Sequence, residues 1–124
     1  MVRRTAWLVA AALGLVPSGP ASAHAALQQA SPRVGSTVAA SPTEVRMWFS
    51  EGLEPAFSRA QVVTAAGQAA VAGAAVVDPK DRRELVIPLL RPLTPGRYRV
   101  KWGVVSVDGH RTEGDFPFTV KGGL

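Results

Sequence analysis

The chain contains no cysteine among its 124 residues. This absence excludes a disulfide framework, thiolate metal ligands and cysteine nucleophiles. Histidine and methionine are also scarce: His24 and His110 are the two histidines, and Met47 is the one methionine besides Met1. Any metal site must therefore be assembled from nitrogen and oxygen donors, and the sequence offers few of the nitrogen donors.

A concentrated run of one charge is missing as well. The chain has 14 Lys and Arg, of which Arg3 and Arg4 precede His24, and 9 Asp and Glu, all after His24, so residues 24–124 carry a net charge of +3. The positive residues are spread along the sequence and form no clustered basic stripe of the kind that binds nucleic acid. We therefore expect no nucleic-acid partner.

The first 23 residues have the three parts of a secretory signal peptide. Arg3 and Arg4 form a basic start, residues 6–16 are apolar, and Ala21-Ser22-Ala23 is an A-x-A cleavage signal. The alternative of a transmembrane anchor would need about 20 apolar residues, more than this run provides. We expect cleavage after Ala23, a mature domain over residues 24–124 that begins at His24, and a periplasmic or extracellular location.

Beyond residue 23 the sequence consists of short alternating segments separated by proline and glycine. Alternation of apolar and polar residues predicts half-buried strands. It is clearest over residues 44–49, 97–104 and 116–121, and weaker over residues 27–30, 59–64 and 84–89.

The Ala/Val-rich stretch over residues 65–77 could also be a helix. Gly67 and Gly73 interrupt it and it has no polar face, so we interpret it as strand and loop. Short strands at this spacing, with turn residues between them, predict an all-β fold: a single antiparallel sandwich or barrel of about seven strands.

His24 becomes chemically distinctive if cleavage occurs after Ala23. A free α-amine and the Nδ1 atom of an N-terminal histidine can close a chelate ring on one metal ion. The amine has a pKa of roughly 7.7–8.0, so it loses its proton readily to a competing metal. A second imidazole would complete a nitrogen-rich tetragonal site, which suits Cu(II).

The other histidine lies in Ser106-Val107-Asp108-Gly109-His110. Asp108 and His110 are two residues apart, so on a strand or its extended exit they would point to the same side. The expected metal ligands are the amine and Nδ1 of His24, a ring nitrogen of His110 and an oxygen of Asp108. Taken separately, a histidine at a chain start is usually solvated and an Asp-Gly pair is usually a turn.

The mature sequence resembles the CopC family along its length and in order. The resemblance rests on these motifs: His24-Ala25-Ala26-Leu27, Ser31-Pro32 and Gly35, Phe49-Ser50-Glu51, Gly96-x-Tyr98-x-Val100-x-Trp102, Val105-Ser106-x-Asp108-Gly109-His110, and Gly114-x-Phe116-x-Phe118-x-Val120.

The resemblance implies a Greek-key sandwich or barrel, related to cupredoxins and immunoglobulin-like domains. It implies one Cu(II) ion per chain, bound by His24, Asp108 and His110, with Glu51 in a second shell or as a weak ligand. It implies copper resistance or homeostasis outside the cytoplasm, without enzymatic activity, and an inner-membrane copper transporter of the CopD type as partner. We expect a monomer.

Some members of the family bind Cu(I) in a methionine-rich loop. Here Met47 lies on the inward face of a predicted strand, where core packing explains it, so we expect no separate Cu(I) site. Two other functions stay open from sequence: a copper-dependent oxidative enzyme of the histidine-brace type, and a metal-free immunoglobulin-like structural module.

Overall fold

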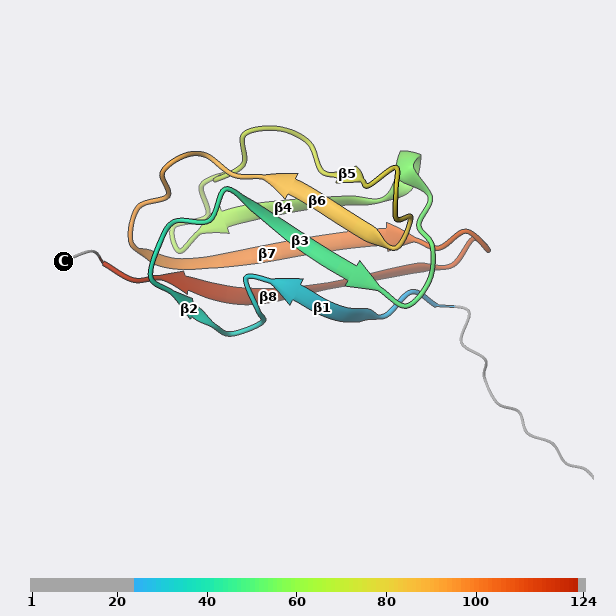
Figure 1. The fold of residues 1–124 in the computed structure, drawn as a ribbon, viewed down its shortest axis with the longest axis horizontal. Coiled ribbons are helices and arrows are strands. Elements are labelled where there is room, and N and C mark those ends of the chain that lie inside the picture. Colours follow the sequence, from blue (N-terminus) through green and yellow to red (C-terminus); the bar gives the residue numbers. More distant parts are fainter. Residues whose placement is uncertain (1–23, 123–124) are drawn as a thin grey trace, which may run out of the picture.

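The computed structural model describes residues 24–122, which form two β-sheets packed face to face (Figure 1). The predicted signal peptide, residues 1–23, lies outside the described residues and stays a prediction. Within residues 24–122, no helix is long and apolar enough to cross a membrane. The all-β sandwich predicted from alternation is confirmed.

The described part of the chain contains eight strands and one short 3₁₀ helix, against the prediction of about seven strands. Two of the eight strands are only two residues long, which is too short for alternation to reveal them. The elements are β1 (Leu27–Ser31), β2 (Thr37–Val38), β3 (Glu44–Phe49), η1 (Pro55–Phe57), β4 (Arg59–Thr64), β5 (Val76–Val77), β6 (Glu84–Pro88), β7 (Gly96–Val105) and β8 (Arg111–Val120).

The strands divide equally between the two sheets. The first sheet has the order β1-β3-β6-β5 and the second has the order β2-β8-β7-β4. All neighbours are antiparallel except β2 and β8, which are parallel. The longest pairing joins β7 and β8 from Gly96↔Val120 to Val105↔Arg111, so these two strands form an extended hairpin across the molecule.

The predicted strands mostly agree with the observed ones, and β8 is the main exception. Alternation predicts a strand from residue 116, whereas β8 begins at Arg111. The preceding residues pair with β7 although they lack large apolar side chains, because Gly114 makes room for Trp102 on the paired strand. The stretch over residues 65–77 forms turns, isolated bridges and β5, which confirms strand and loop rather than helix.

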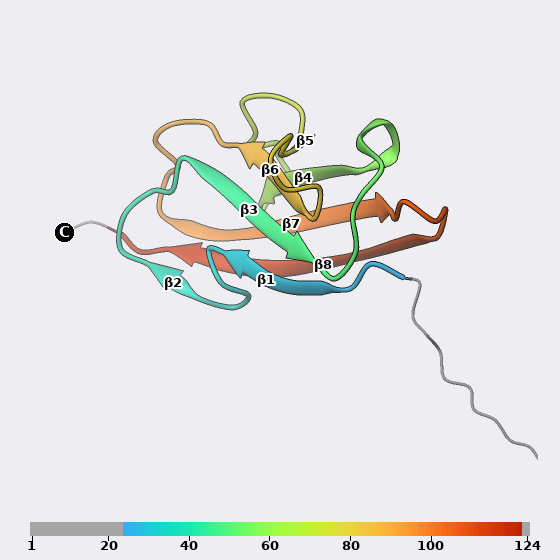
Figure 2. The ribbon, with the colours of Figure 1, turned by 45° about the vertical axis from the view of Figure 1, so that its right-hand side comes forward.

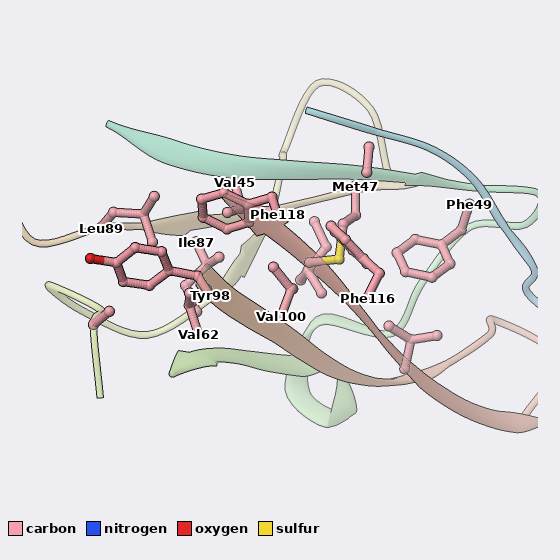
Figure 3. Close-up of a cluster of buried hydrophobic side chains, with 14 of the residues drawn as sticks. Val45, Met47, Phe49, Val62, Ile87, Leu89, Tyr98, Val100, Phe116 and Phe118 are labelled. Carbon is pink, nitrogen blue, oxygen red and sulfur yellow. The ribbon is translucent and has the colours of Figure 1, made fainter. Parts of the chain in front are cut away.

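The core lies between the sheets and is built from the inward side chains of the alternating strands (Figure 3). Val45, Met47 and Phe49 of β3 are buried and alternate with half-buried polar neighbours. On the facing sheet, the rings of Tyr98 and Phe118, which are partners on β7 and β8, stack with centroids 5.5 Å apart. The prediction that Met47 packs in the core is confirmed.

The first described residues and the β7–β8 turn lie at the same end of the sandwich. In Figures 1 and 2 the blue start of the chain passes beside the turn that joins the orange β7 to the red β8. The fold therefore brings His24 next to the segment that contains Asp108 and His110, although 86 positions separate the two histidines in sequence.

Candidate metal centre

The segment that follows His24 is fixed to the body of the sandwich. The side chain of Ala25 is fully buried, and its carbonyl oxygen accepts a hydrogen bond of 2.8 Å from the Thr112 hydroxyl on β8. A methyl group in the core and a hydrogen bond to the neighbouring sheet restrict where the chain can pass. They hold His24 close to the start of β8.

Ser50, just after β3, holds the same segment from the other side. Its amide donates to the carbonyl of Ala26 over 2.9 Å, and its hydroxyl oxygen accepts the Ala26 amide at 2.8 Å. The Ser50 hydroxyl also lies 3.3 Å from the carbonyl oxygen of His24 and donates to it. The two residues after His24 are therefore tied to both sheets before β1 begins.

A tight turn presents Asp108 and His110. The amide of Gly109 donates to the carbonyl of Ser106 over 2.8 Å, and the amide of Ser106 donates to the carbonyl of His110 over 2.9 Å. Gly109 has φ of 91°, a left-handed conformation that glycine adopts without a steric penalty. Strand alternation is thus the wrong explanation for the approach of Asp108 to His110, because the two residues lie in a turn between strands.

The two histidine rings meet at this end of the molecule. Their centroids are 4.9 Å apart with an interplanar angle of 66°, an edge-on arrangement. Metal–nitrogen bonds to histidine are about 2.0–2.1 Å long, so two imidazoles that share one ion must have ligand nitrogens within about 4 Å. The observed separation of the rings is compatible with both binding the same ion.

Asp108 lies against His110 and is tied to its own turn. Its Oδ1 atom accepts a hydrogen bond from the Ser106 hydroxyl and lies 3.3 Å from Nδ1 of His110. The hydrogen bond from Ser106, followed by the interaction with His110, lowers the pKa of the Asp108 carboxyl. A carboxylate against one ring nitrogen orients an imidazole so that its other nitrogen, Nε2, can face a metal.

The predicted ligands are open to solvent. The side chains of His110 and Asp108 are 50% and 43% exposed, and His24 is also exposed. Among residues 24–122 no group of three or more His, Asp or Glu side chains is arranged to hold a metal ion. A site at this end therefore needs a further donor, and the α-amine of a chain that begins at His24 would provide one.

The fourth predicted residue, Glu51, lies in the loop that follows β3 and is partly buried. Within the described residues no hydrogen bond or ion pair joins it to His24, Asp108 or His110. This loop does reach the turn, because the amide of Val107 donates to the carbonyl of Gly52 over 2.9 Å. The role of Glu51 beside a metal stays a prediction.

The sequence predicted no role at this site for Ser50, Ser106 or Thr112, although Ser50 and Ser106 lie within the motifs that resemble the CopC family. Ser106 could have been found, since a serine two residues before an aspartate in a predicted turn often bonds locally. Thr112 gives no such signal, because its partner Ala25 is 87 positions away in sequence.

The CopC domain family matches residues 27–121 of the chain. Copper resistance protein C of Pseudomonas syringae pv. tomato is 36% identical over 126 residues, covering 98% of this chain and 99% of that protein. Protein YobA of Escherichia coli K12 is 39% identical over 99 residues, covering 80% of each chain.

A longer relative contains a similar region. Copper transport protein CutJ of Bacillus subtilis is 28% identical over 120 residues, which cover 96% of this chain but 22% of that protein. In CutJ the region similar to this chain is therefore joined to a much larger remainder.

Two solved structures share the fold. The crystal structure of CopC from Methylosinus trichosporium OB3b has a TM-score of 0.74 and 38% identity, covering 80% of this chain and 95% of that one. PcoC of Escherichia coli, described as a methionine-rich copper resistance protein, has a TM-score of 0.69 and 37% identity, covering 80% and 100%. The family match spans most of the sequence, and the chain belongs to the CopC domain family.

Proposed function

We propose that this protein binds one Cu(II) ion outside the cytoplasm and sequesters or carries it, in copper resistance or homeostasis. The observation that carries the proposal is the edge-on approach of His24 and His110, with ring centroids 4.9 Å apart. These are the two histidines of the whole sequence, and they lie at opposite ends of it. Core packing does not explain their approach, because both side chains are exposed.

The proposed ligands are the α-amine and Nδ1 of His24, a ring nitrogen of His110 and the Asp108 carboxylate, which would leave Nδ1 of His110 to bind the metal. Three nitrogens and one oxygen favour Cu(II), which prefers tetragonal nitrogen and oxygen sites and stands highest in the affinity order of divalent metals. A soft thioether site for Cu(I) has no support within residues 24–122, because the one methionine there, Met47, is fully buried in the core.

The proposed site depends on export and processing. With Ala23 still attached, the nitrogen of His24 is an amide and cannot form the chelate. Removal of residues 1–23 as a signal peptide would create the amine beside the turn that carries His110. Bonds from Thr112 and Ser50 would then hold the new N-terminus in place.

Relatives support copper as the ion. Their names include copper resistance protein C and copper transport protein CutJ, and none of the relatives described above is named as an enzyme. CutJ also supports a transport partner, since a CopC-like region there forms part of a longer copper transport protein. We propose an inner-membrane transporter of the CopD type as the protein that exchanges copper with this chain.

Titration of the secreted protein with Cu(II), followed by mass spectrometry and electron paramagnetic resonance, tests the proposal. We expect a mature N-terminus at His24, one bound Cu(II) and nitrogen hyperfine structure in the spectrum. His110→Ala should lower the affinity strongly, whereas Lys80→Ala, an exposed control away from the site, should not. A different N-terminus, or a spectrum without nitrogen ligation, would contradict the proposal.

A further inference from the structure

The two outer faces of the sandwich differ in charge. We use the name basic face for the outward residues of β4, β7 and β8 that carry charge. It contains five cations and two carboxylates, a net charge of +3, which equals the net charge of residues 24–124. These residues are Arg59, Arg97, Arg99, Lys101, Arg111, Glu113 and Asp115.

The opposite face has the reverse balance. On the outside of β3 and β6, Arg46 lies 2.5 Å from Glu44 and 2.5 Å from Glu84, and 4.0 Å from Asp78. On these two strands one cation thus faces two carboxylates, while Asp78 belongs to the β5–β6 loop, which also contains Lys80, Arg82 and Arg83. The charged residues are spread evenly along the sequence, but the fold separates positive from negative charge. A negatively charged surface would attract the basic face and repel the outer face of β3 and β6.

Three cations of the basic face are without a carboxylate partner. Arg99 pairs with Asp115, and Arg111 lies 3.7 Å from Glu113 in a pair whose side chains are 59% and 72% exposed. Arg59, Arg97 and Lys101 make no ion pair among residues 24–122. Their charges are available to an external anion.

The basic face is hollowed between these side chains. A hollow of about 230 Å³ lies above Gly103, and its charged lining residues are Arg59, Lys101, Arg111 and the carboxylate Glu113, which leaves an excess of two positive charges. Gly103 has no side chain to fill it, and the nearest atom to a Cβ built there would be Nη2 of Arg111, at 3.9 Å. Arg59 pairs with Gly103 across the sheet, so cations border the hollow on two neighbouring strands.

A second hollow continues the first along β4 and β7. Its volume is about 390 Å³, and its lining includes Arg97, Arg99 and again Lys101. Both hollows are large enough for a phosphate group, and guanidinium groups bind phosphate oxygens through paired hydrogen bonds. Lys101 lines both hollows and can contact a phosphate in either one.

We propose that the basic face docks on an anionic phospholipid surface, with headgroup phosphates in the two hollows. A protein partner is less favoured, because the centre of a protein interface is depleted of charged residues and enriched in aromatic side chains. The large exposed apolar side chains, Val34, Phe57, Val76, Leu90 and Val107, all lie outside this face. Clusters of Lys and Arg bind anionic lipid by charge alone.

Such docking would keep the protein at the membrane where a copper transporter resides. Arg111, at one end of the basic face, is adjacent in sequence to His110, so the candidate metal centre lies near the edge of this face. The inference rests on the proposed export for its location, but the charged face itself does not depend on copper.

Flotation of the secreted chain with lipid vesicles tests the inference. We expect binding to vesicles that contain phosphatidylglycerol, no binding to pure phosphatidylcholine vesicles, and weaker binding as ionic strength rises. The double variant Arg59→Gln/Lys101→Gln should lower binding about tenfold or more. The matched variant Arg33→Gln/Lys80→Gln removes the same charge from exposed loops and should keep most of the binding.

Equal loss in both double variants would show a response to net charge and overturn the inference. Absence of binding to phosphatidylglycerol, or self-association of the chain through the two oppositely charged faces, would overturn it as well. Both variants should retain their Cu(II) affinity. Lipid binding that persists in a chain that fails to bind Cu(II) would contradict the proposed function and leave the docking inference intact.

Discussion

At the scale of single residues, the candidate centre depends on the backbone around His24 as much as on its ring. A free amine on a loose chain end would pay a large entropic cost to meet a second imidazole. Here Ala25 is buried and its carbonyl is bonded to Thr112. The backbone at His24 is thus held in place by contacts with both sheets, so an amine created there by cleavage would be positioned in advance, which would favour tight binding.

Thr112→Val tests this positioning. The substitution keeps the shape of the side chain and removes the 2.8 Å hydrogen bond to the carbonyl of Ala25. We expect the free energy of unfolding to fall by about 1 kcal/mol, and the Cu(II) affinity to fall about tenfold, as for other residues that orient metal ligands. Urea denaturation and Cu(II) titration measure the two effects.

Thr119→Val is the matched control, since Thr119 lies on the same strand and has no hydrogen bond to the N-terminal segment. It should leave the Cu(II) affinity unchanged. If both variants lose affinity to the same extent, Thr112 has no special role in holding His24.

Gly114 is a second residue whose identity is explained by a tertiary contact, because it packs against the ring of Trp102. A Cβ at this position would lie 2.6 Å from Cζ2 of Trp102, too close for any side chain to fit without movement. We expect Gly114→Ala to lower the free energy of unfolding by about 1–3 kcal/mol through overpacking.

Gly122→Ala serves as the comparison, because a Cβ there would be 3.7 Å from the side chain of Pro95, an ordinary contact. Thermal unfolding of the two variants measures the difference. An unchanged melting temperature for Gly114→Ala would show that Trp102 does not pack against Gly114 as described.

At the scale of elements, alternation identified the strands that contribute to the core. β3 and β4 have the predicted bounds. Apolar and polar residues alternate cleanly in β3, and turns flank β4 on both sides. β2 was not predicted and β5 was predicted only as part of the strand and loop over residues 65–77, since two residues cannot establish a period. The beginning of β8 was missed because its pairing depends on Gly114 and Trp102, a contact between strands that local pattern does not reveal.

The outer face of the first sheet contains an ion-pair cluster whose contribution can be measured. Glu84 is 5% exposed and would be left without its cation if Arg46 were replaced. The two carboxylates Glu84 and Glu44 raise the pKa of Arg46 through their hydrogen bonds, so the guanidinium stays charged.

We expect Arg46→Met to lower the free energy of unfolding by about 1–2 kcal/mol. The loss is smaller than for a fully buried pair, because the Arg46 side chain is 38% exposed and water screens the interaction. Arg99→Met removes an exposed pair with Asp115 and should cost about 0.5 kcal/mol or less. Equal losses in urea denaturation would contradict a special role for the buried carboxylate.

At the scale of the whole molecule, the sequence predicted the class of fold and the residues of the candidate centre, but not what joins them. Motif resemblance pointed to His24, Asp108 and His110. The turn geometry of Gly109 and the bonds from Thr112 and Ser50 come from tertiary contacts between distant segments. The difference in charge between the two faces was also not predicted from the sequence. The charged residues of one face come from several strands, so they are far apart along the chain.

The core of the described residues consists of apolar side chains and includes none of the proposed copper ligands, so copper should stabilise the fold rather than create it. Ligand that binds only the folded state adds about 2.7 kcal/mol when its concentration is 100 times Kd. We expect Cu(II) to raise the melting temperature of the chain that begins at His24, and a chelator to return it to the apo value without unfolding. Unfolding on chelation at room temperature would contradict this account.

The most direct test of the central claim adds one glycine before His24 and compares the two proteins with Cu(II). The extended chain keeps His24, Asp108 and His110 but moves the free amine away from the His24 ring. We expect a large loss of Cu(II) affinity and an altered electron paramagnetic resonance spectrum with changed nitrogen hyperfine structure. Identical affinity and an identical spectrum would show that the amine of His24 does not bind the metal.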